Sequence, residues 1–261
     1  MKRVPCLVLS VSLFYLISPS RAQEPLTRQH APDGGTMVRF SSIVIPSTAS
    51  APFTATVNAE WIRHLPDGSN ITLVNHRTVA RDANGRIYQE RAYFVPNDGK
   101  HESYVAQIEI SDPTASQIYI CQVAERVCRL REFSPKAGPE FAVVAPGKVG
   151  TPGLTVENLG KQTVAGLETV GTRETHVVEA AAIGNDAPIF ERREFWYSPQ
   201  LGINLITKRE DPRFSSQQNF EVTNVSLGEP DAKLFDLPAG FKIIDLRNPP
   251  ERLAGSAPSP E

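Results

Sequence analysis

The sequence has few of the features that identify an enzyme or a nucleic-acid-binding protein. Its 261 residues include three cysteines, two methionines and two tryptophans, and the formal net charge is −2. Because charges of both signs are dispersed along the chain, no basic face is expected to match the phosphates of a nucleic acid. The same dispersion argues against electrostatic docking on an anionic membrane. We therefore expect no nucleic-acid partner.

Motifs of catalysis and of metal or phosphate binding are also missing. The sequence contains no Gly-x-Ser-x-Gly, no His-Glu-x-x-His and no phosphate-binding glycine loop. Two cysteines without a nearby pair of histidines do not make a structural zinc site. The sequence thus predicts a protein that is not an enzyme, with no catalytic residue, no metal ligand and no cofactor. A hydrolase with acids or a histidine on a concave sheet face is kept as a third hypothesis.

One apolar run stands out, Val4–Ile17, which follows two basic residues. Small residues come after it at the positions that a signal peptidase reads. We predict a signal peptide over residues 1–22, cleaved between Ala22 and Gln23. No other run of about 18 apolar residues occurs, so no transmembrane segment is expected in the mature chain. The predicted location is the periplasm or the exterior of the cell.

Two cysteines, Cys121 and Cys128, lie outside the predicted signal peptide. A tight reversal centred on Ala124 and Glu125 would place them directly opposite each other on two strands, at the separation that a disulfide needs. An oxidising compartment favours such a bond. We predict a disulfide that staples a β-hairpin. The alternative, a redox-active pair, lacks the CxxC spacing at a helix start.

Side chains alternate with the period of two that is typical of β-strands. The clearest case begins at Phe53, where apolar residues at every second position would share one face. A glycine turn is expected at Gly160-Lys161. Beyond the strand at 53–61, the strands predicted by alternation and turn residues are 70–81, 86–94, 104–110, 117–123, 126–133, 155–159, 163–179, 189–197, 201–210, 219–227 and 241–246.

Helix-compatible sequence is scarce, and the best candidate is a turn or two at Asp231–Phe235, capped by Asp231. Short strands joined by tight turns exclude a parallel α/β sheet, which needs crossover helices. One large curved antiparallel sheet, a closed barrel and two small β domains remain. We favour a single mainly β domain, a curved antiparallel sheet or incomplete barrel with one or two short helices.

The predicted domain organisation follows from these segments. Polar ends rich in proline and glycine are predicted to be a mobile leader and a disordered tail. The ranges are a leader at 23–49, a β domain at 50–246 and a tail at 247–261, the domain consisting of an N-terminal meander at 50–133, a connection at 134–152 and a C-terminal meander at 153–246.

Three motifs stand out in the C-terminal half, Leu159–Arg173, Arg193–Pro199 and Gly228–Phe241. They resemble motifs of exported bacterial proteins of unknown function. Those proteins in turn look like the superfamily of lipoprotein carriers and their relatives, LolA, LolB and RseB. The resemblance covers roughly residues 150–245 by motif. It implies an incomplete, strongly bent antiparallel barrel with helices covering its mouth.

A bent sheet of this kind has a concave face on which bulky apolar side chains could receive a guest. We expect a lipid, an acyl chain or another hydrophobic small molecule to bind there. The alternative is that these residues form the core of a closed structure, and a second functional hypothesis is an interaction or scaffold module that contacts another cell-envelope protein. The candidate ligand-binding residues are Trp61, Tyr104, Ile108, Phe195 and Tyr197.

Overall fold

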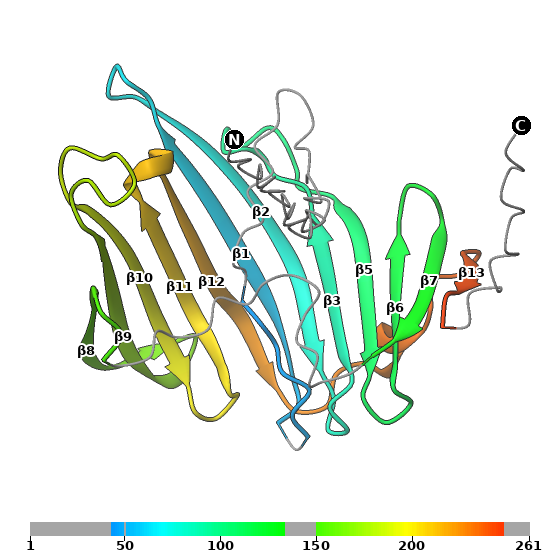
Figure 1. The fold of residues 1–261 in the computed structure, drawn as a ribbon. Helices are drawn as coiled ribbons and strands as arrows, with labels where there is room; N and C mark the ends of the chain where they lie inside the picture. Colours follow the sequence, from blue (N-terminus) through cyan, green and yellow to red (C-terminus); the bar gives the residue numbers. More distant parts are fainter. Residues whose placement is uncertain (1–42, 50, 134–149, 248–261) are drawn as a thin grey trace, which may run out of the picture. The chain divides into compact units, whose positions relative to one another are not determined.

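The structure is a computed structural model that describes residues 43–49, 51–133 and 150–247, and these residues build one broad, open β-sheet (Figure 1). The spatial order of the strands is β13-β7-β6-β5-β3-β2-β1-β12-β11-β10-β9-β8, with β4 beside β2. The strands are β1 (Phe53–His64), β2 (Asn70–Arg81), β3 (Ile87–Ala92), β4 (Val95–Pro96), β5 (Val105–Asp112), β6 (Gln117–Gln122), β7 (Val127–Glu132), β8 (Leu154–Val164), β9 (Leu167–Val178), β10 (Ile189–Ser198), β11 (Ile203–Asp211), β12 (Ser216–Leu227) and β13 (Lys242–Asp245).

The pairing of β1 with β12 joins the two meanders into this one sheet. It runs from Phe53 opposite Leu227 to Arg63 opposite Ser216. β8 and β13 remain at the two edges, so the sheet does not close into a barrel. The predicted fold class, a single curved and mainly antiparallel sheet, is confirmed.

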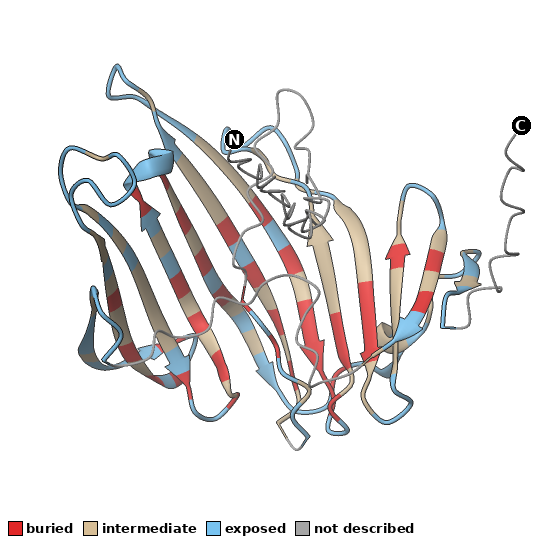
Figure 2. Ribbon diagram, viewed as in Figure 1, coloured by how far each residue is buried: buried red, intermediate tan, exposed pale blue. Residues whose placement is uncertain are grey.

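The two faces of the sheet are distinguished by their cross-strand rows, because directly opposed residues point to the same side. One row contains Ala59, Phe220, Thr207 and Phe195 on β1, β12, β11 and β10. We call the side of this row the core face and the opposite side the reverse face. Buried residues alternate with more exposed ones along β1, β11 and β12 (Figure 2).

The main hydrophobic cluster lies on the core face around β1. Its members are contributed by strands that are far apart in the sequence, and Val57 and Val222 are both fully buried at the β1–β12 junction. The cluster comprises Ile43, Ile45, Phe53, Ala55, Val57, Ala59, Val79, Ile87, Val164, Leu167, Leu201, Ile203, Leu205, Phe220 and Val222.

Residues 43–49, which the sequence analysis places in a mobile leader, lie against the sheet. Ile43 and Ile45 are buried in the main cluster. Arg81 of β2 is fully buried and donates to the carbonyl oxygens of Pro46, Ala51 and Leu201, at 2.7–3.1 Å. Apolar burial and these hydrogen bonds hold the segment in place. Residues 23–42 and the predicted signal peptide lie outside the described residues.

The C-terminal part crosses the reverse face. After β12, the 3₁₀ helix η2 (Ala232–Phe235) packs with Leu237 against a smaller cluster of Ala80, Tyr88 and Ile110. The side chain of Asp231 accepts from the Lys233 amide, so the predicted cap is confirmed, although the helix is a 3₁₀ turn. A second 3₁₀ helix, η1 (Pro212–Phe214), precedes β12.

The last strand departs from the predicted antiparallel pattern. β13 pairs with β7 in parallel, with Ile243 opposite Cys128. A parallel neighbour needs a crossover connection, and the segment containing η2 provides it by carrying the chain from β12 to β13. Among the helices of residues 43–49, 51–133 and 150–247, none has the length and apolar character to cross a membrane.

The predicted reversal at Gly160-Lys161 is wrong, because β8 continues to Val164. Gly160 has a positive φ of 82° and sits in a bulge, where the Asn158 side chain accepts from its amide. The turn lies at Ala165-Gly166, whose φ angles of 48° and 81° are both positive, as a two-residue type I′ hairpin requires. A glycine with positive φ thus marks a bulge in one place and a turn in the other.

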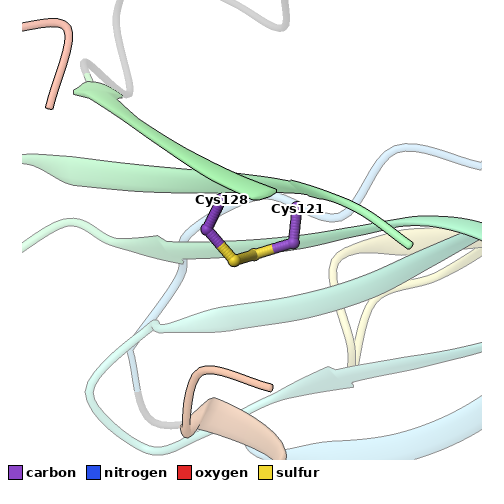
Figure 3. The surroundings of a disulfide bond; sticks show 2 residues. All are labelled: Cys121 and Cys128. Carbon is purple, nitrogen blue, oxygen red and sulfur yellow. A yellow bond between two sulfur atoms is a disulfide. The ribbon is translucent and has the colours of Figure 1, made fainter. Parts of the chain in front are cut away.

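The predicted disulfide joins β6 to β7 (Figure 3). Cys121 and Cys128 are directly opposed, fully buried and bonded, with Cα atoms 3.8 Å apart. The hairpin that they staple carries β13 on its outer side. The bond therefore stabilises one edge of the sheet.

Replacing both cysteines by serine should lower the free energy of unfolding by about 2 kcal/mol, because the closed loop is short and the entropic gain grows with loop length. Urea unfolding of the double variant and the oxidised protein measures this difference. Mass mapping under non-reducing conditions should find Cys121 linked to Cys128. Free thiols in the exported protein would contradict the prediction.

The residues around Gly171 of β9 leave no space for a side chain at this position. A Cβ atom there would lie 2.6 Å from the Trp196 ring and 2.8 Å from the Cβ of Leu159. Gly171→Ala should therefore cost about 1–3 kcal/mol of stability by overpacking. Thermal unfolding checks this, and the double variant with Trp196→Ala should lose less stability than the sum of the single variants. Unchanged stability of the single Gly171 variant would refute the prediction.

Candidate ligand-binding surface

Trp61 lies on the core face where apolar residues give way to polar ones. It is opposite Leu73 of β2 on one side and Gln218 of β12 on the other. The next row toward the main cluster contains Ala59, flanked by Asn75 and Phe220. The Trp61 ring, which is half-buried, therefore borders the apolar cluster and a set of buried polar side chains.

Three of these polar side chains, Asn75, Arg77 and Gln218, are buried with unsatisfied atoms. Their exposed fractions are 8%, 5% and 5%. Asn75 Oδ1, Arg77 Nη1 and Gln218 Oε1 have no hydrogen-bond partner among the residues that the structure describes. Buried polar groups are paired in the large majority of cases, and an unpaired one costs about 1–3 kcal/mol. Three such groups therefore lie in neighbouring rows of one face.

Arg77 is the one charged side chain among the three. Its Nη2 is 3.5 Å from the Ile43 carbonyl oxygen. Burial, with a contribution from the nearby charge of Arg91, lowers the pKa of the Arg77 guanidinium to about 9, although Glu109 and Glu90 act in the opposite direction. The group is still charged at neutral pH, and burying a charge is costly unless it is paired.

The carboxylate near Arg77 is already engaged by other donors. Glu109 is buried and accepts from Arg91 at 3.0 and 3.2 Å and from the side-chain amides of Gln89 and Gln107 at 2.6 Å each. Four donors fill most of the acceptor capacity of one carboxylate. Glu109 therefore compensates Arg91 in the first place, and among the described residues no carboxylate is in direct contact with Arg77.

Across the sheet, the core-face charges of β9, β10 and β11 are balanced. The row of Trp61 and Gln218 continues through Arg209 and Arg193 to Glu174. The ion pairs on this side are Arg193–Glu174 at 3.4 Å, Arg209–Glu191 at 3.2 Å, Arg213–Glu191 at 3.2 Å and Arg213–Asp211 at 2.6 Å.

The reverse face carries a ladder of alternating charges, which is typical of a solvated sheet face. One row runs through Glu157, Arg173, Glu194, Lys208 and Asn219, and Asn219 donates to Glu60 at 2.8 Å. Consecutive charges are 3.0–3.6 Å apart. A depression of about 420 Å³ over β9–β12 is lined by charged side chains of both signs and by Gln217, and it includes Arg173, Glu194 and Lys208 of this row. These three side chains are paired with each other.

The five sequence-predicted ligand residues do not gather in one site. Trp61 and Phe195 share the core face and lie in neighbouring rows. Their strands, β1 and β10, are three strand spacings apart, a distance of about 14 Å. Ile108 neighbours Glu109 on β5 and lies on the reverse face, packed against the smaller cluster. Tyr104 precedes β5, and its exposed ring stacks on Tyr93 with centroids 4.8 Å apart. Tyr197 is exposed beyond a bulge in β10.

Sequence reasoning missed Asn75, Arg77 and Gln218. A signal for the first two existed, because the turn at residues 66–69 sets the pairing of β1 with β2 and thereby places Asn75 and Arg77 opposite Ala59 and Val57. Polar residues opposite buried apolar ones would have stood out. No cluster of three or more histidine, cysteine or acidic side chains suited to a metal occurs in the described ranges.

The buried ion pairs predict a loss of stability in acid. Burial raises the pKa of Asp211, but hydrogen bonds from Arg213 outweigh this effect, and the net pKa lies below its usual value. A lowered pKa stabilises the fold above the unfolded-state value of about 4, and this contribution disappears as the pH falls through the native-state pKa. Asp211→Asn, which keeps the capping oxygen, should flatten the pH dependence of urea unfolding between pH 7 and 3. An unchanged slope in Asp211→Asn would contradict the prediction.

Comparison with known proteins finds no match among protein-family models and none among curated proteins. Solved structures do match. A chain from the MucA/MucB complex of Pseudomonas aeruginosa is 14% identical with a TM-score of 0.38, covering 76% of this chain and 59% of that one, so this chain spans less than two thirds of its length. An uncharacterized conserved protein from Thermus thermophilus is 9% identical with a TM-score of 0.40, covering 75% and 91%. A LolA-superfamily protein from Nitrosomonas europaea is 12% identical with a TM-score of 0.29, covering 71% and 90%.

Proposed function

We propose that this protein is a non-enzymatic binding protein of the cell envelope that holds a ligand with an apolar part on the core face beside Trp61. The observation that carries the proposal is the set of three unsatisfied buried polar atoms, on Asn75, Arg77 and Gln218, in the three consecutive core-face rows that run from Val57 to Trp61. Ligand sites combine an apolar lining with a few polar groups that fix orientation. These rows supply both.

The apolar part of the ligand has a suitable surface next to the polar group. Trp61 and Phe195 are half-buried rather than enclosed, and Phe220 lies in the same row as Phe195. Aromatic rings of this size provide large apolar contact areas. An acyl chain lying along these rows would cover the rings while its polar end reaches Asn75 and Arg77.

Export to the envelope is part of the proposal. The Cys121–Cys128 disulfide supports it, because such bonds persist in oxidising compartments and are rare in the cytosol of most organisms. The predicted cleavage between Ala22 and Gln23 would release the mature chain. Sequencing the N-terminus of protein purified from its native host tests this site, since a mature chain starting elsewhere contradicts it.

Docking of an envelope protein on a sheet edge has weaker support. β8 is a terminal strand, and most of its residues are exposed. Its bulge at Asn158 and Gly160 and the charges of Glu157 and Lys161 are devices that protect edge strands from pairing with other chains. Such an edge is poorly suited to adding a partner strand.

The two tryptophans allow a direct test, because they lie on opposite faces. Trp196 donates to Glu194 of the reverse-face ladder at 2.9 Å, whereas Trp61 is on the core face. In Trp196→Phe, titration with dodecanoic acid should produce a saturable change in the fluorescence of Trp61. In Trp61→Phe, the fluorescence of Trp196 should not respond.

Affinity provides the second readout. Trp61→Ala should weaken dodecanoic acid binding about tenfold, because roughly 1.5 kcal/mol of apolar contact is lost. Calorimetry measures this value, with Trp196→Ala as the matched control. Equal responses of both tryptophans, or no binding to the wild-type protein, would overturn the proposed function.

A further inference from the structure

We infer that the ligand carries an anionic head group that also has an O–H or N–H donor, bound by Arg77 and Asn75. This inference rests on the proposed function and names the chemistry of its ligand. It follows from what each unsatisfied atom requires. Arg77 Nη1 is a charged donor and needs an acceptor, whereas Asn75 Oδ1 and Gln218 Oε1 are acceptors and need donors.

The anionic requirement follows from the charges around the site. Arg91 has the carboxylate of Glu109, and Arg193 has that of Glu174. Arg77 has the carbonyl oxygen of Ile43 at 3.5 Å. A guanidinium prefers planar acceptors that receive two parallel hydrogen bonds, so a carboxylate or phosphate matches its free edge.

The donor requirement follows from the orientation of the Asn75 amide. Its Nδ2 donates to the Ala92 carbonyl oxygen at 3.0 Å, and this bond leaves Oδ1 as the atom without a partner. Asn75 and Arg77 are two residues apart on β2, so their side chains emerge from the same face about 7 Å apart. One head group with a charged acceptor and a nearby donor can span that distance.

Arg81 is a natural internal control. It lies four residues after Arg77 on the same strand and face and is also buried, but its nitrogens donate to three carbonyl oxygens and its guanidinium is 5.2 Å from the Phe53 ring centroid. Arg81 therefore has a structural role. The two arginines should respond differently to the same substitution.

The experiment compares three probes with closely related tails on the full mature chain. N-dodecanoylglycine has an anionic carboxylate and an amide N–H, its methyl ester lacks the charge, and dodecanoate lacks the N–H. Wild-type protein should bind N-dodecanoylglycine at least about tenfold more tightly than the ester, a difference of about 1.4 kcal/mol. The affinity for dodecanoate should lie between the other two affinities.

In Arg77→Gln the preference for the anion should disappear while ester binding is retained, and in Arg81→Gln the preference should persist in the folded fraction.

Stability separates a binding role of Arg77 from a structural one. Arg77→Gln removes an uncompensated buried charge and should leave the melting temperature of the ligand-free protein unchanged or higher, whereas Arg81→Gln should lower it. Asn75→Asp places a carboxylate beside Arg77, loses the hydrogen bond from Asn75 to Ala92, and should also weaken the anion preference of the folded protein, which provides a second variant should Arg77→Gln not fold. Equal binding of acid and ester by wild type, or a preference that survives Arg77→Gln and Asn75→Asp, overturns the inference. Binding of none of the three probes overturns the proposed function instead.

Discussion

The pairing of β1 with β12 is the contact on which the rest of the structure depends. It connects residues about 165 positions apart, as in the hydrogen bond from Asn58 to Thr223. Val57 and Val222 are buried where these strands meet, so the main cluster exists only once the two meanders have joined. Closing such a long loop adds little to the entropic cost compared with a loop half as long, but contacts this distant in sequence form slowly. The candidate site depends on the same pairing, because Trp61 of β1 is directly opposite Gln218 of β12 in the register of these strands.

The two faces of the sheet differ in how their charged side chains are compensated. On the reverse face, Arg173, Glu194 and Lys208 alternate at the surface, where each pair contributes little and water screens any imbalance. On the core face, charges are buried and an imbalance is expensive. Arg81 is compensated by the backbone carbonyl oxygens of Pro46, Ala51 and Leu201. Within the described part of the chain, Arg77 has no comparable set of acceptors, and this contrast, rather than burial alone, is the basis for proposing a binding role for Arg77 and a structural one for Arg81.

Much of the fold follows from local sequence signals. Alternation from Phe53 onward predicts β1, turn residues predict its pairing with β2, and the spacing of Cys121 and Cys128 predicts a hairpin register that the disulfide confirms. The failures have physical causes. Gly160 has the positive φ that a turn requires but uses it in a bulge. Ile43 and Ile45 stand in a segment without strand alternation, so their burial depends on a surface that forms only after the sheet does.

The site was only partly predictable from the sequence. Two residues on different strands can be assigned to the same face only when the register of every strand pairing between them is known. Trp61 could be placed from its own strand, and Asn75 and Arg77 could be placed through the β1–β2 turn. Gln218 and Phe195 could not, since their placement needs the pairing of β1 with β12, which no local turn specifies. Tyr104 and Ile108 are candidates because they are bulky, but the size of a side chain does not determine the face on which it lies. Ile108 is next to Glu109 on β5, so its side chain points to the face opposite that of Glu109. Polar residues that oppose apolar ones across a known register are therefore better indicators of a binding site in a sheet of this kind than large aromatic residues are.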